Sequence, residues 1–485
     1  MKRSFFAAVW LSLPAFAQET IDAFEAPPPG PAVSVIGWAG AHAGVDTRFE
    51  SAEPEGLSEN VGELSGRARL AIDGKLSERV RLLVEGRAWW RGVTQRSFAR
   101  SKGVFEASLG EAFVDLYSPR VDWRLGNQVV AFGANAAFAP ADGLNPRDLR
   151  QGFFAAELAE AKLPVFGARA STEVGRVSLT AAYFPFFTPS RYTVFGQDEA
   201  LLQPGLGPAF PTRIDASIED ALQPHLLETE RPRGFPWLGD VGLRATTEVG
   251  RFRVGGSWLW MNEKLPRVTL DPELAALLSA HARGEPVSPA VALSVQNRFA
   301  AGERLVQGRY ARTHVLSLEA STLWKTAQLD ADFSYSPGQT FFDLDFNPVT
   351  KSALTWVLGV SQAEDSPLLY ALTYVGMAVP DVEARELLFL LEPTTAQGAS
   401  RVAWLHLVVG QVSYRTFSDQ LELSVRAGFE PIQRSFAVAP KMTYLGVGRA
   451  RLWLAAEVYQ GADLSPFGYF GRNDRVLAGV EVDLF

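Results

Sequence analysis

The feature that most constrains this chain is an alternation of apolar and polar residues that continues well beyond the length of an ordinary strand. From Leu64 to Trp90 the even positions are mostly apolar or small and the odd positions are mostly charged, with a short turn at Ser77-Glu78. Successive residues of a β-strand point to opposite faces of the sheet. The spacing therefore predicts a long hairpin with one apolar and one charged face.

The same alternation returns in the second half of the chain. It is found over Leu329–Tyr335, Leu421–Glu430 and Ala450–Tyr459. Strands of about ten residues or more exceed the usual globular length, but they match the roughly 9–11 residues with which a tilted strand crosses a bilayer. These segments are therefore predicted to cross a membrane.

Connections between the predicted strands alternate between very short and very long. Short turns are expected at Ser77-Glu78, Ser118-Pro119-Arg120, Gly175 and Gly250, and long Pro-rich or polar segments at roughly Thr188–Pro236, Glu263–Arg304 and Pro380–Ser400. Short turns on one side and long loops on the other are typical of transmembrane barrels, and lipid requires a closed sheet in which every backbone group is paired. A soluble β-sandwich is the alternative, but it rarely needs such long strands.

The predicted fold is therefore an all-β, transmembrane antiparallel β-barrel of about 18 strands, within a range of roughly 16–18. Its first strand is expected to begin near Ala32, and its last to run from Arg475 to Phe485. Short turns would face the periplasm and long loops the outside of the cell, and one of the loops is a candidate for folding into the lumen.

The N-terminus predicts export to the outer membrane of a Gram-negative bacterium. A basic start at Lys2-Arg3, an apolar run over Phe5–Phe16 and the small residues of Ala15-Phe16-Ala17 form a signal peptide over residues 1–17. Residues 18–31 would then be a short periplasmic segment, and residues 32–485 the barrel. A segment this short leaves no room for the N-terminal plug domain of a TonB-dependent receptor.

Composition excludes several classes of protein. The chain has no cysteine, so disulfides, cysteine-bound metals and thiol chemistry are absent. Loss of Lys2 and Arg3 with the signal reduces the 46 basic residues to 44 against 54 acidic ones, a mature net charge of −10. Such a chain is a poor nucleic-acid binder. No cofactor or metal site is expected.

Charged residues on one face of the early strands predict the lining of the pore. A charge on the lipid face would cost about 2–4 kcal/mol near the membrane midplane, so these side chains should point into the lumen. They are Arg67, Arg69, Arg81, Glu85, Arg87, Glu111, Asp115, Asp122, Arg124 and Gln128. They could filter solutes as charged rings do, or pair across strands and simply fill a polar interior. The two interpretations are compatible.

The segment from Arg124 to Arg150 interrupts the alternation. It opens as a strand, continues as an Ala/Gly/Asn-rich run and closes on Asn145-Pro146-Arg147-Asp148. Asn145 is a good N-cap, Pro146 suits the first helical position and Asp148 would lie in the first turn, which predicts a short helix from Pro146. We expect this loop to fold into the lumen as a constriction, with Arg147 and Arg150 available to permeating solutes. A surface loop with a helix cap is the alternative.

A second helix is expected inside the long Glu263–Arg304 segment. Asp271-Pro272-Glu273 begins an amphipathic stretch that continues to Leu278, and Arg283-Gly284 ends it. This helix could be a lid or a plug, or could pack within the loop.

Catalytic motifs are missing from the sequence, and no enzyme activity is predicted. The five histidines are His42, His225, His281, His314 and His406, and none belongs to an HExxH pair. No GxSxG elbow is present. His314 and His406 lie on apolar faces, where packing or a position at the lipid interface is expected.

Short motifs give the chain a resemblance to known barrels. Gly126-Asn127-Gln128, then Phe132-Gly133 and Asn145-Pro146, resemble a family of proteobacterial outer-membrane barrels that carries a domain of unknown function. Pro440-Lys441-Met442-Thr443-Tyr444 and Val458-Tyr459-Gln460-Gly461 are similar to the same family. Alginate-export porins are more distantly similar. Where the family often has Trp-Gly, this chain has Phe132-Gly133. The resemblance implies a fold and a location rather than an activity.

The function predicted from these features is a porin-like channel for passive or substrate-preferring passage of small solutes. The alternatives are a plugged surface barrel with a structural or adhesive role and, least favoured, an outer-membrane barrel enzyme. Expected partners are outer-membrane lipid and lipopolysaccharide, the barrel-assembly machinery through the C-terminal strand ending at Phe485, and a small solute whose identity the sequence does not reveal.

Overall fold

A computed structural model gives the fold of the chain. It describes residues 32–47, 60–95, 101–135, 138–150, 161–192, 232, 239–282, 286, 288–342, 348–362, 366–383, 391, 401–416, 419–462, 465–471 and 473–484. The predicted signal peptide and periplasmic segment, residues 1–31, and the C-terminal Phe485 lie outside these ranges.

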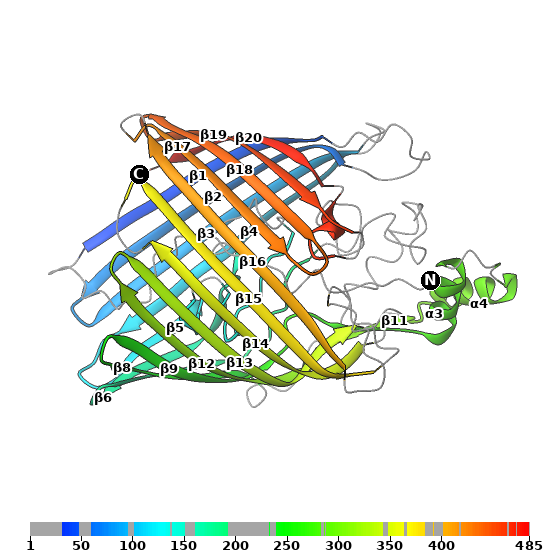
Figure 1. The fold of residues 1–485 in the computed structure, drawn as a ribbon, viewed down its shortest axis with the longest axis horizontal. Coiled ribbons are helices and arrows are strands. Elements are labelled where there is room, and N and C mark those ends of the chain that lie inside the picture. Colours follow the sequence, from blue (N-terminus) through cyan, green and yellow to red (C-terminus); the bar gives the residue numbers. More distant parts are fainter. Residues whose placement is uncertain are drawn as a thin grey trace.

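The strands form one closed barrel of 18 antiparallel strands (Figure 1). They are β1 (Ala32–Asp46), β2 (Asn60–Ser77), β3 (Val80–Gln95), β4 (Ser101–Leu116), β5 (Asp122–Gln128), β6 (Val165–Val174), β7 (Val177–Phe184), β8 (Asp240–Val249), β9 (Phe252–Asn262), β12 (Arg312–Trp324), β13 (Ala327–Phe342), β14 (Pro348–Gln362), β15 (Leu368–Val382), β16 (Arg401–Thr416), β17 (Leu421–Glu430), β18 (Ser435–Val447), β19 (Ala450–Gln460) and β20 (Arg475–Asp483). Each pairs with its neighbour in the chain, and β1 closes the ring by pairing with β20 from Trp38–Asp483 to Asp46–Arg475.

The predicted fold class, strand number and start of the first strand are thus confirmed. Gly175 and Gly250 sit in the tight β6–β7 and β8–β9 turns at φ values of 65° and 63°, a conformation that favours glycine. Every connection at one end of the barrel, here called the short-turn end, spans at most five residues, and all the longer connections lie at the other end, the long-loop end.

The outer face of the barrel is apolar and the inner face is largely covered. Outward side chains such as Leu70, Leu358 and Leu454 are 44%, 51% and 47% exposed. Within β3, by contrast, Leu83, Glu85, Arg91 and Val93 of the opposite parity are buried. A contiguous exposed apolar band of this kind marks a surface made for lipid. Among the described helices, none is long and apolar enough to cross a bilayer.

Aromatic residues flank the outward histidines. His314 of β12 is outward and stacks on Trp258 and Trp260 of β9. The His406 ring stacks on Trp404, and its Nδ1 lies 2.7 Å from the hydroxyl of Tyr374. These contacts agree with the expected packing role, because aromatic girdles are typical of barrel surfaces at the membrane interface.

A charged substitution on the outward face is expected to destabilise the barrel according to its depth in the membrane. Leu454→Arg places a cation in the middle of β19, and we expect the free energy of unfolding to fall by about 2–4 kcal/mol. Leu76→Arg makes the same change at the end of β2, where a loss of about 0–1 kcal/mol is expected. Urea titration of protein folded into lipid vesicles measures both values. Equal losses at the two positions would contradict the assigned membrane face.

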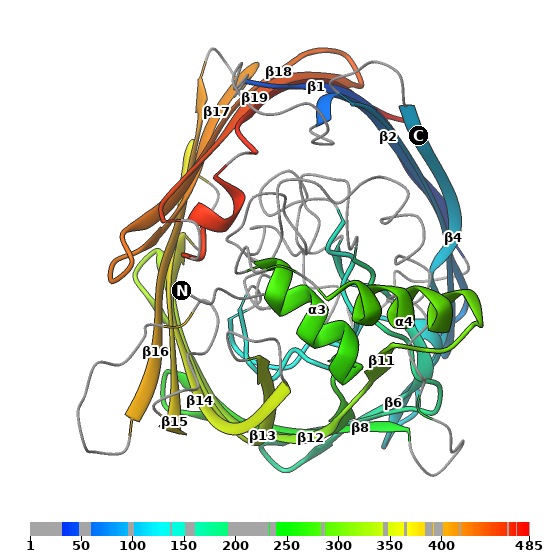
Figure 2. The same ribbon diagram turned by 90° about the vertical axis from the view of Figure 1, so that its right-hand side faces the viewer.

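Two helices extend from the long-loop end. The expected helix is present as α3 (Pro272–Ala282), and Asp271 Oδ1 accepts a hydrogen bond from Glu273 N at 3.0 Å. A further helix, α4 (Pro289–Ala300), was not predicted. They are linked to the barrel by a small sheet of β10 (Arg267–Leu270) and β11 (Val306–Arg309). In Figure 2 both helices lie in front of the ring of strands.

Candidate functional site

The predicted lumen-lining residues gather on the inner face of β2 to β5, here called the charged wall. Arg69 and Arg87 are directly opposite each other on β2 and β3, a placement that would repel. The fully buried carboxylate of Glu85 separates them. It accepts a hydrogen bond from Arg69 Nε at 2.8 Å and another from Arg87 Nε. The buried carboxylate of Glu85 therefore offsets the repulsion between the two arginines.

A second unit lies nearer the short-turn end. Arg124 binds the Asp115 carboxylate through two hydrogen bonds, of 2.7 and 3.0 Å, and its guanidinium lies 3.8 Å from the centre of the Phe113 ring. Arg81 binds Asp73 in the same two-point manner and approaches Asp115 to 3.9 Å. Pairing across strands is thus a principal role of these charges.

The remaining predicted residues have separate roles. Arg67 is half-buried on the inner parity of β2. Asp122 begins β5, and its Oδ1 accepts a hydrogen bond from Ser118 N at 3.1 Å, so it stabilises a short turn. Glu111 accepts one from Val129 N at 2.9 Å. Gln128 is fully buried and donates to the carbonyl of Gly167 at 3.1 Å.

A bulge in β4 reverses the parity of the charged wall. The ladder shifts between Val84–Ala112 and Gly86–Leu109, which leaves an additional residue opposite Glu85. A Cβ at Gly110 would lie 2.1 Å from Glu85 Oε1, so glycine makes room for that carboxylate. Beyond the bulge, the even-numbered Glu106 turns inward, where it binds Arg150. Sequence parity alone missed Glu106 for this reason.

The motif Gly126-Asn127-Gln128 ends β5 and directs the following chain into the barrel. Gly126 has φ 134°, and a Cβ there would lie 2.2 Å from the Ala112 carbonyl oxygen. Asn127 Nδ2 donates to Gly110 O at 2.5 Å. The side chain of Asn145 then closes the loop, because its amide donates to Gln128 O at 3.1 Å and its oxygen accepts from Val130 N at 2.8 Å.

The helix predicted from Pro146 is not formed. Arg147 and Asp148 instead make β-bridges to Lys162 and Arg191. The Arg147 amide donates to Ser190 Oγ at 3.0 Å and the Asp148 amide to Ala161 O at 2.6 Å. The backbone amides at the start of the predicted helix are thus hydrogen-bonded to residues distant in the sequence. The side-chain oxygen of Asn145, which an N-cap would use as the acceptor, already accepts a hydrogen bond from Val130 N.

Residues 129–135 and 138–150, here called the in-folded segment, reach far into the lumen. Asp332, on the third of β13 nearest the short turn, accepts hydrogen bonds from Ala134 N at 2.9 Å and Asn135 N at 2.7 Å. Arg244 of β8 donates to Gly133 O at 3.1 Å. The segment therefore leaves β5 and is held at strands on another part of the wall.

Apolar contacts support the same position. The in-folded residues join one buried cluster with inward residues of β6, β7, β9 and β12. The cluster consists of Val130, Phe132, Ala141, Leu144, Val165, Ala182, Phe184, Leu259, Met261 and Val315. These contacts make the segment a packed element inside the barrel, not the surface loop of the alternative interpretation.

The two arginines of the segment are engaged in ion pairs. Arg150 binds Glu106 at 2.5 Å and Asp148 at 2.6 Å, and Arg147 binds Asp142 at 3.2 Å. Burial lowers the pKa of Arg150, but the hydrogen bonds to Asp148 and Glu106 outweigh it and leave the pKa above its ordinary value. These arginines order the segment, so they are not free ligands for a passing solute.

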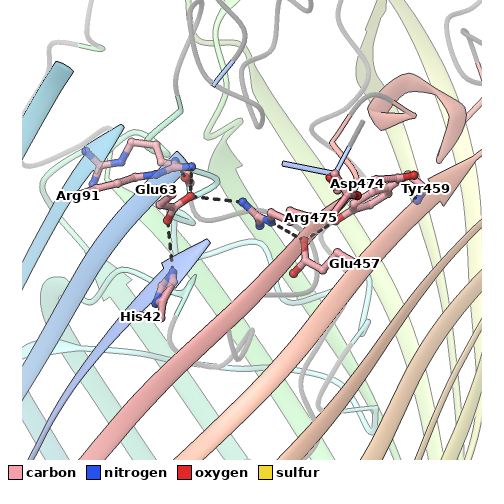
Figure 3. A network of polar contacts seen from close by, with 9 residues as sticks. His42, Glu63, Arg91, Glu457, Tyr459, Asp474 and Arg475 are labelled. Atoms are coloured by element: carbon pink, nitrogen blue, oxygen red, sulfur yellow. Dashed lines mark hydrogen bonds and ion pairs between the residues drawn. The ribbon is translucent and has the colours of Figure 1, made fainter. Parts of the chain in front are cut away.

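A third charged group spans the closure of the barrel, as Figure 3 shows. Glu63 of β2 lies 2.7 Å from Arg91, 3.3 Å from His42 and 3.5 Å from Arg475. Arg475 of β20 also binds Glu457 at 2.8 Å. Because β1 and β20 are the two ends of the sheet, these bonds tie the closing strands together. Glu63 and Arg91 are odd-numbered like the predicted lumen-lining residues of β2 and β3, so the alternation in the sequence could have predicted that they point inward.

The opposite inner face, here called the apolar wall, carries few polar groups. It comprises Ala353, Val357, Val375, Met377, Val379, Ala403, Leu405, Leu407 and Val409, on β14 to β16. All are buried although they point inward, because described loop residues such as Phe138, Tyr192, Phe467 and Phe470 pack against them. The lumen is therefore divided into a charged side and an apolar side.

A cavity of about 240 Å³ remains between the in-folded segment and the apolar wall. Its floor and sides include Val375, Met377, Leu405 and Leu407. Glu263, which also lines the cavity, accepts a hydrogen bond from Thr340 N at 2.7 Å. Burial raises the pKa of Glu263, against the hydrogen bonds from Thr340 that lower it.

Neither a metal site nor a sequence match to a known family helps to define the function of this lumen. Within the described ranges, no group of three or more His, Asp or Glu residues could hold a metal ion. No protein-family model matches the chain, and no curated protein matches it in sequence. The resemblance to one particular barrel family therefore has no support from these comparisons.

Three solved structures are similar to this chain at low sequence identity. OccAB1 of Acinetobacter baumannii is 10% identical with a TM-score of 0.47, over 94% of this chain and 97% of that one. OpdL of Pseudomonas aeruginosa is 12% identical with a TM-score of 0.44, over 93% and 99%. OmpF of Salmonella typhi, solved with daunomycin, is 11% identical with a TM-score of 0.41, over 93% and 97%.

Proposed function

We propose that this protein is an outer-membrane channel for small solutes, narrowed by its in-folded segment. The observation that carries the proposal is the attachment of Ala134 and Asn135 to Asp332, which places a packed element across a barrel of 18 strands. Barrels of about this size leave an aqueous lumen unless something occupies it. A loop fixed inside such a lumen sets the width of the path beside it.

The proposal places the chain in the outer membrane of a Gram-negative bacterium. The N-terminal residues 1–17 would direct export, the short turns would face the periplasm, and the exposed apolar band would face lipid and lipopolysaccharide. The C-terminal strand would be read by the barrel-assembly machinery. We propose no catalytic role for any residue.

The charged wall supports a preference for anions. Its carboxylates Glu85 and Asp115 are fully buried, whereas the side chains of Arg69, Arg81 and Arg87 are 35%, 21% and 24% exposed. Beside Glu85 and Asp115 a solute therefore meets guanidinium groups first, together with the Asp73 carboxylate, which is 24% exposed. Charged rows in a low-dielectric channel select ions by sign.

A salt gradient tests this preference. Across a planar bilayer with unequal KCl on the two sides, the reversal potential of the native channel is expected to indicate an excess of chloride flow. Arg87→Gln should move the potential toward potassium, because Arg69 alone then faces Glu85. Arg251→Gln, a loss of the same charge in the exposed β8–β9 turn, should leave it unchanged. A native channel that prefers potassium would contradict the proposed role of the wall.

A plugged surface barrel remains a second candidate function. The observation in its favour is the α3–α4 pair, which extends from the long-loop end around its own buried cluster of Val268, Leu274, Val295, Leu305 and Val306. A barrel with that role would carry no current with or without these helices.

A further inference from the structure

The cavity beside the in-folded segment has the composition of a binding site. One side consists of the apolar wall residues Val375, Met377, Leu405 and Leu407, and the other includes Asp142 and Arg147 of the segment. Binding sites for small molecules combine such apolar linings with a few convergent polar groups. The cavity is distinct from the charged wall, on which the preference for anions rests.

Two buried polar atoms in this lining lack a partner among the residues that the structure describes. They are the amide nitrogen Nε2 of Gln339 and the carboxylate oxygen Oδ1 of Asp142. Both residues line the cavity, and each is only 7% exposed. Buried polar atoms are normally hydrogen-bonded, so one unmatched donor and one unmatched acceptor point to a group that completes them.

The charges of the lining argue against an ionic ligand. Two acidic residues, Asp142 and Glu263, and two basic residues, Arg147 and Lys264, line the cavity. Asp142 binds Arg147 and Lys162, at 3.2 and 2.6 Å, and Lys264 binds Asp240. An ion entering beside these matched pairs would lose its hydration without gaining a free counter-charge.

We propose that this cavity binds a small, uncharged amphipathic solute with an apolar body and a hydroxyl group, such as a simple phenol. A hydroxyl is able to donate to a carboxylate oxygen and to accept from an amide. The volume of about 240 Å³ exceeds the roughly 150 Å³ of an apolar protein cavity that accommodates benzene, so a substituted ring fits. A sugar would leave the apolar wall unmatched, and a hydrocarbon would leave both polar atoms unmatched.

This inference rests on the proposed channel and names the solute class that the channel would prefer. The solute would lodge on the apolar side of the in-folded segment while ions pass along the charged wall. Because the two paths share one lumen, a bound solute is expected to interrupt the ionic current.

Isothermal titration of the purified, detergent-folded full chain with 4-methylphenol tests the proposal, with toluene and glycerol as comparison probes. Saturable binding of 4-methylphenol is expected, stronger than binding of either comparison. Gln339→Leu removes the amide donor and should weaken binding about fivefold to tenfold. Leu405→Trp should fill the cavity and abolish binding. Thr373→Val, an inward change on β15 that does not line the cavity, should leave binding unchanged.

Three results would overturn the proposal: no saturable heat with 4-methylphenol, equal binding of toluene, or equal affinities for the native chain and Gln339→Leu. Bilayer recordings on the same preparations separate its failure from that of the channel. Current without phenol binding overturns the cavity proposal alone. Saturable binding that Gln339→Leu weakens, in a protein without current, supports the cavity as a site and overturns the channel.

Discussion

Deleting Asn135–Leu144 is expected to raise the single-channel conductance at least about twofold, because a lumen of this strand number is wide once nothing occupies it. The deletion removes one of the two residues whose amides bind Asp332, together with the buried Ala141 and Leu144. The remaining chain would no longer reach across the lumen, and the path for ions would widen.

A point substitution checks the same conclusion without shortening the chain. Asp332→Ala removes the acceptor of both backbone hydrogen bonds and should give a larger or more variable conductance than the native channel. Asp330→Ala is the matched control, since Asp330 lies on the same strand and accepts a hydrogen bond from Gln328 instead. Native conductance in both the deletion and Asp332→Ala would rule out a constriction by this segment.

Asp115→Asn is expected to lower the free energy of unfolding by about 3–5 kcal/mol, the usual cost of removing one partner from a buried ion pair. Asp115 is fully buried, and the Arg124 side chain that it neutralises is only 4% exposed. The substitution leaves a buried guanidinium beside a neutral amide. Arg81 loses a nearby carboxylate as well.

The control is the same change in an exposed pair of similar geometry. Arg451 Nη2 lies 2.8 Å from both carboxylate oxygens of Asp483, and these side chains are 46% and 44% exposed. Asp483→Asn should therefore cost only about 0–1 kcal/mol. Urea unfolding in lipid vesicles measures both variants. A loss for Asp115→Asn no larger than that for Asp483→Asn would mean that the charged wall is hydrated rather than buried.

The barrel itself was predictable from the sequence because lipid imposes one strict pattern. A side chain of the wrong kind on the lipid face is costly, so residues such as Leu70 and Leu454 repeat at every second position and reveal each strand. The short turns followed from glycine and from the brevity of the polar interruptions. The lumen-lining parity of β2 and β3 could be read in the same way.

Other features depend on contacts between distant residues. The bulge in β4 reverses which residues of that strand point inward, so Glu106 faces the lumen. Gly110 is the one local sequence feature that indicates the bulge. Asn145-Pro146 has a good helix-start sequence, yet the Asn145 side chain is hydrogen-bonded to the backbone of Gln128 and Val130 and does not cap a helix. The apolar wall could not be recognised in the sequence because Ala403–Val409 is largely apolar on both faces. One face contacts lipid and the other contacts the loops that cover it. Alternation disappears wherever both faces are buried.

The current through the native chain in a planar bilayer tests the central claim most directly. Folded protein, verified by its resistance to unfolding at room temperature, is added at low concentration and the steps in current are recorded. A solute channel narrowed by the in-folded segment predicts discrete, reproducible steps that persist at constant voltage and grow in the Asn135–Leu144 deletion. Absence of any step from native protein that is demonstrably folded and inserted would contradict the account.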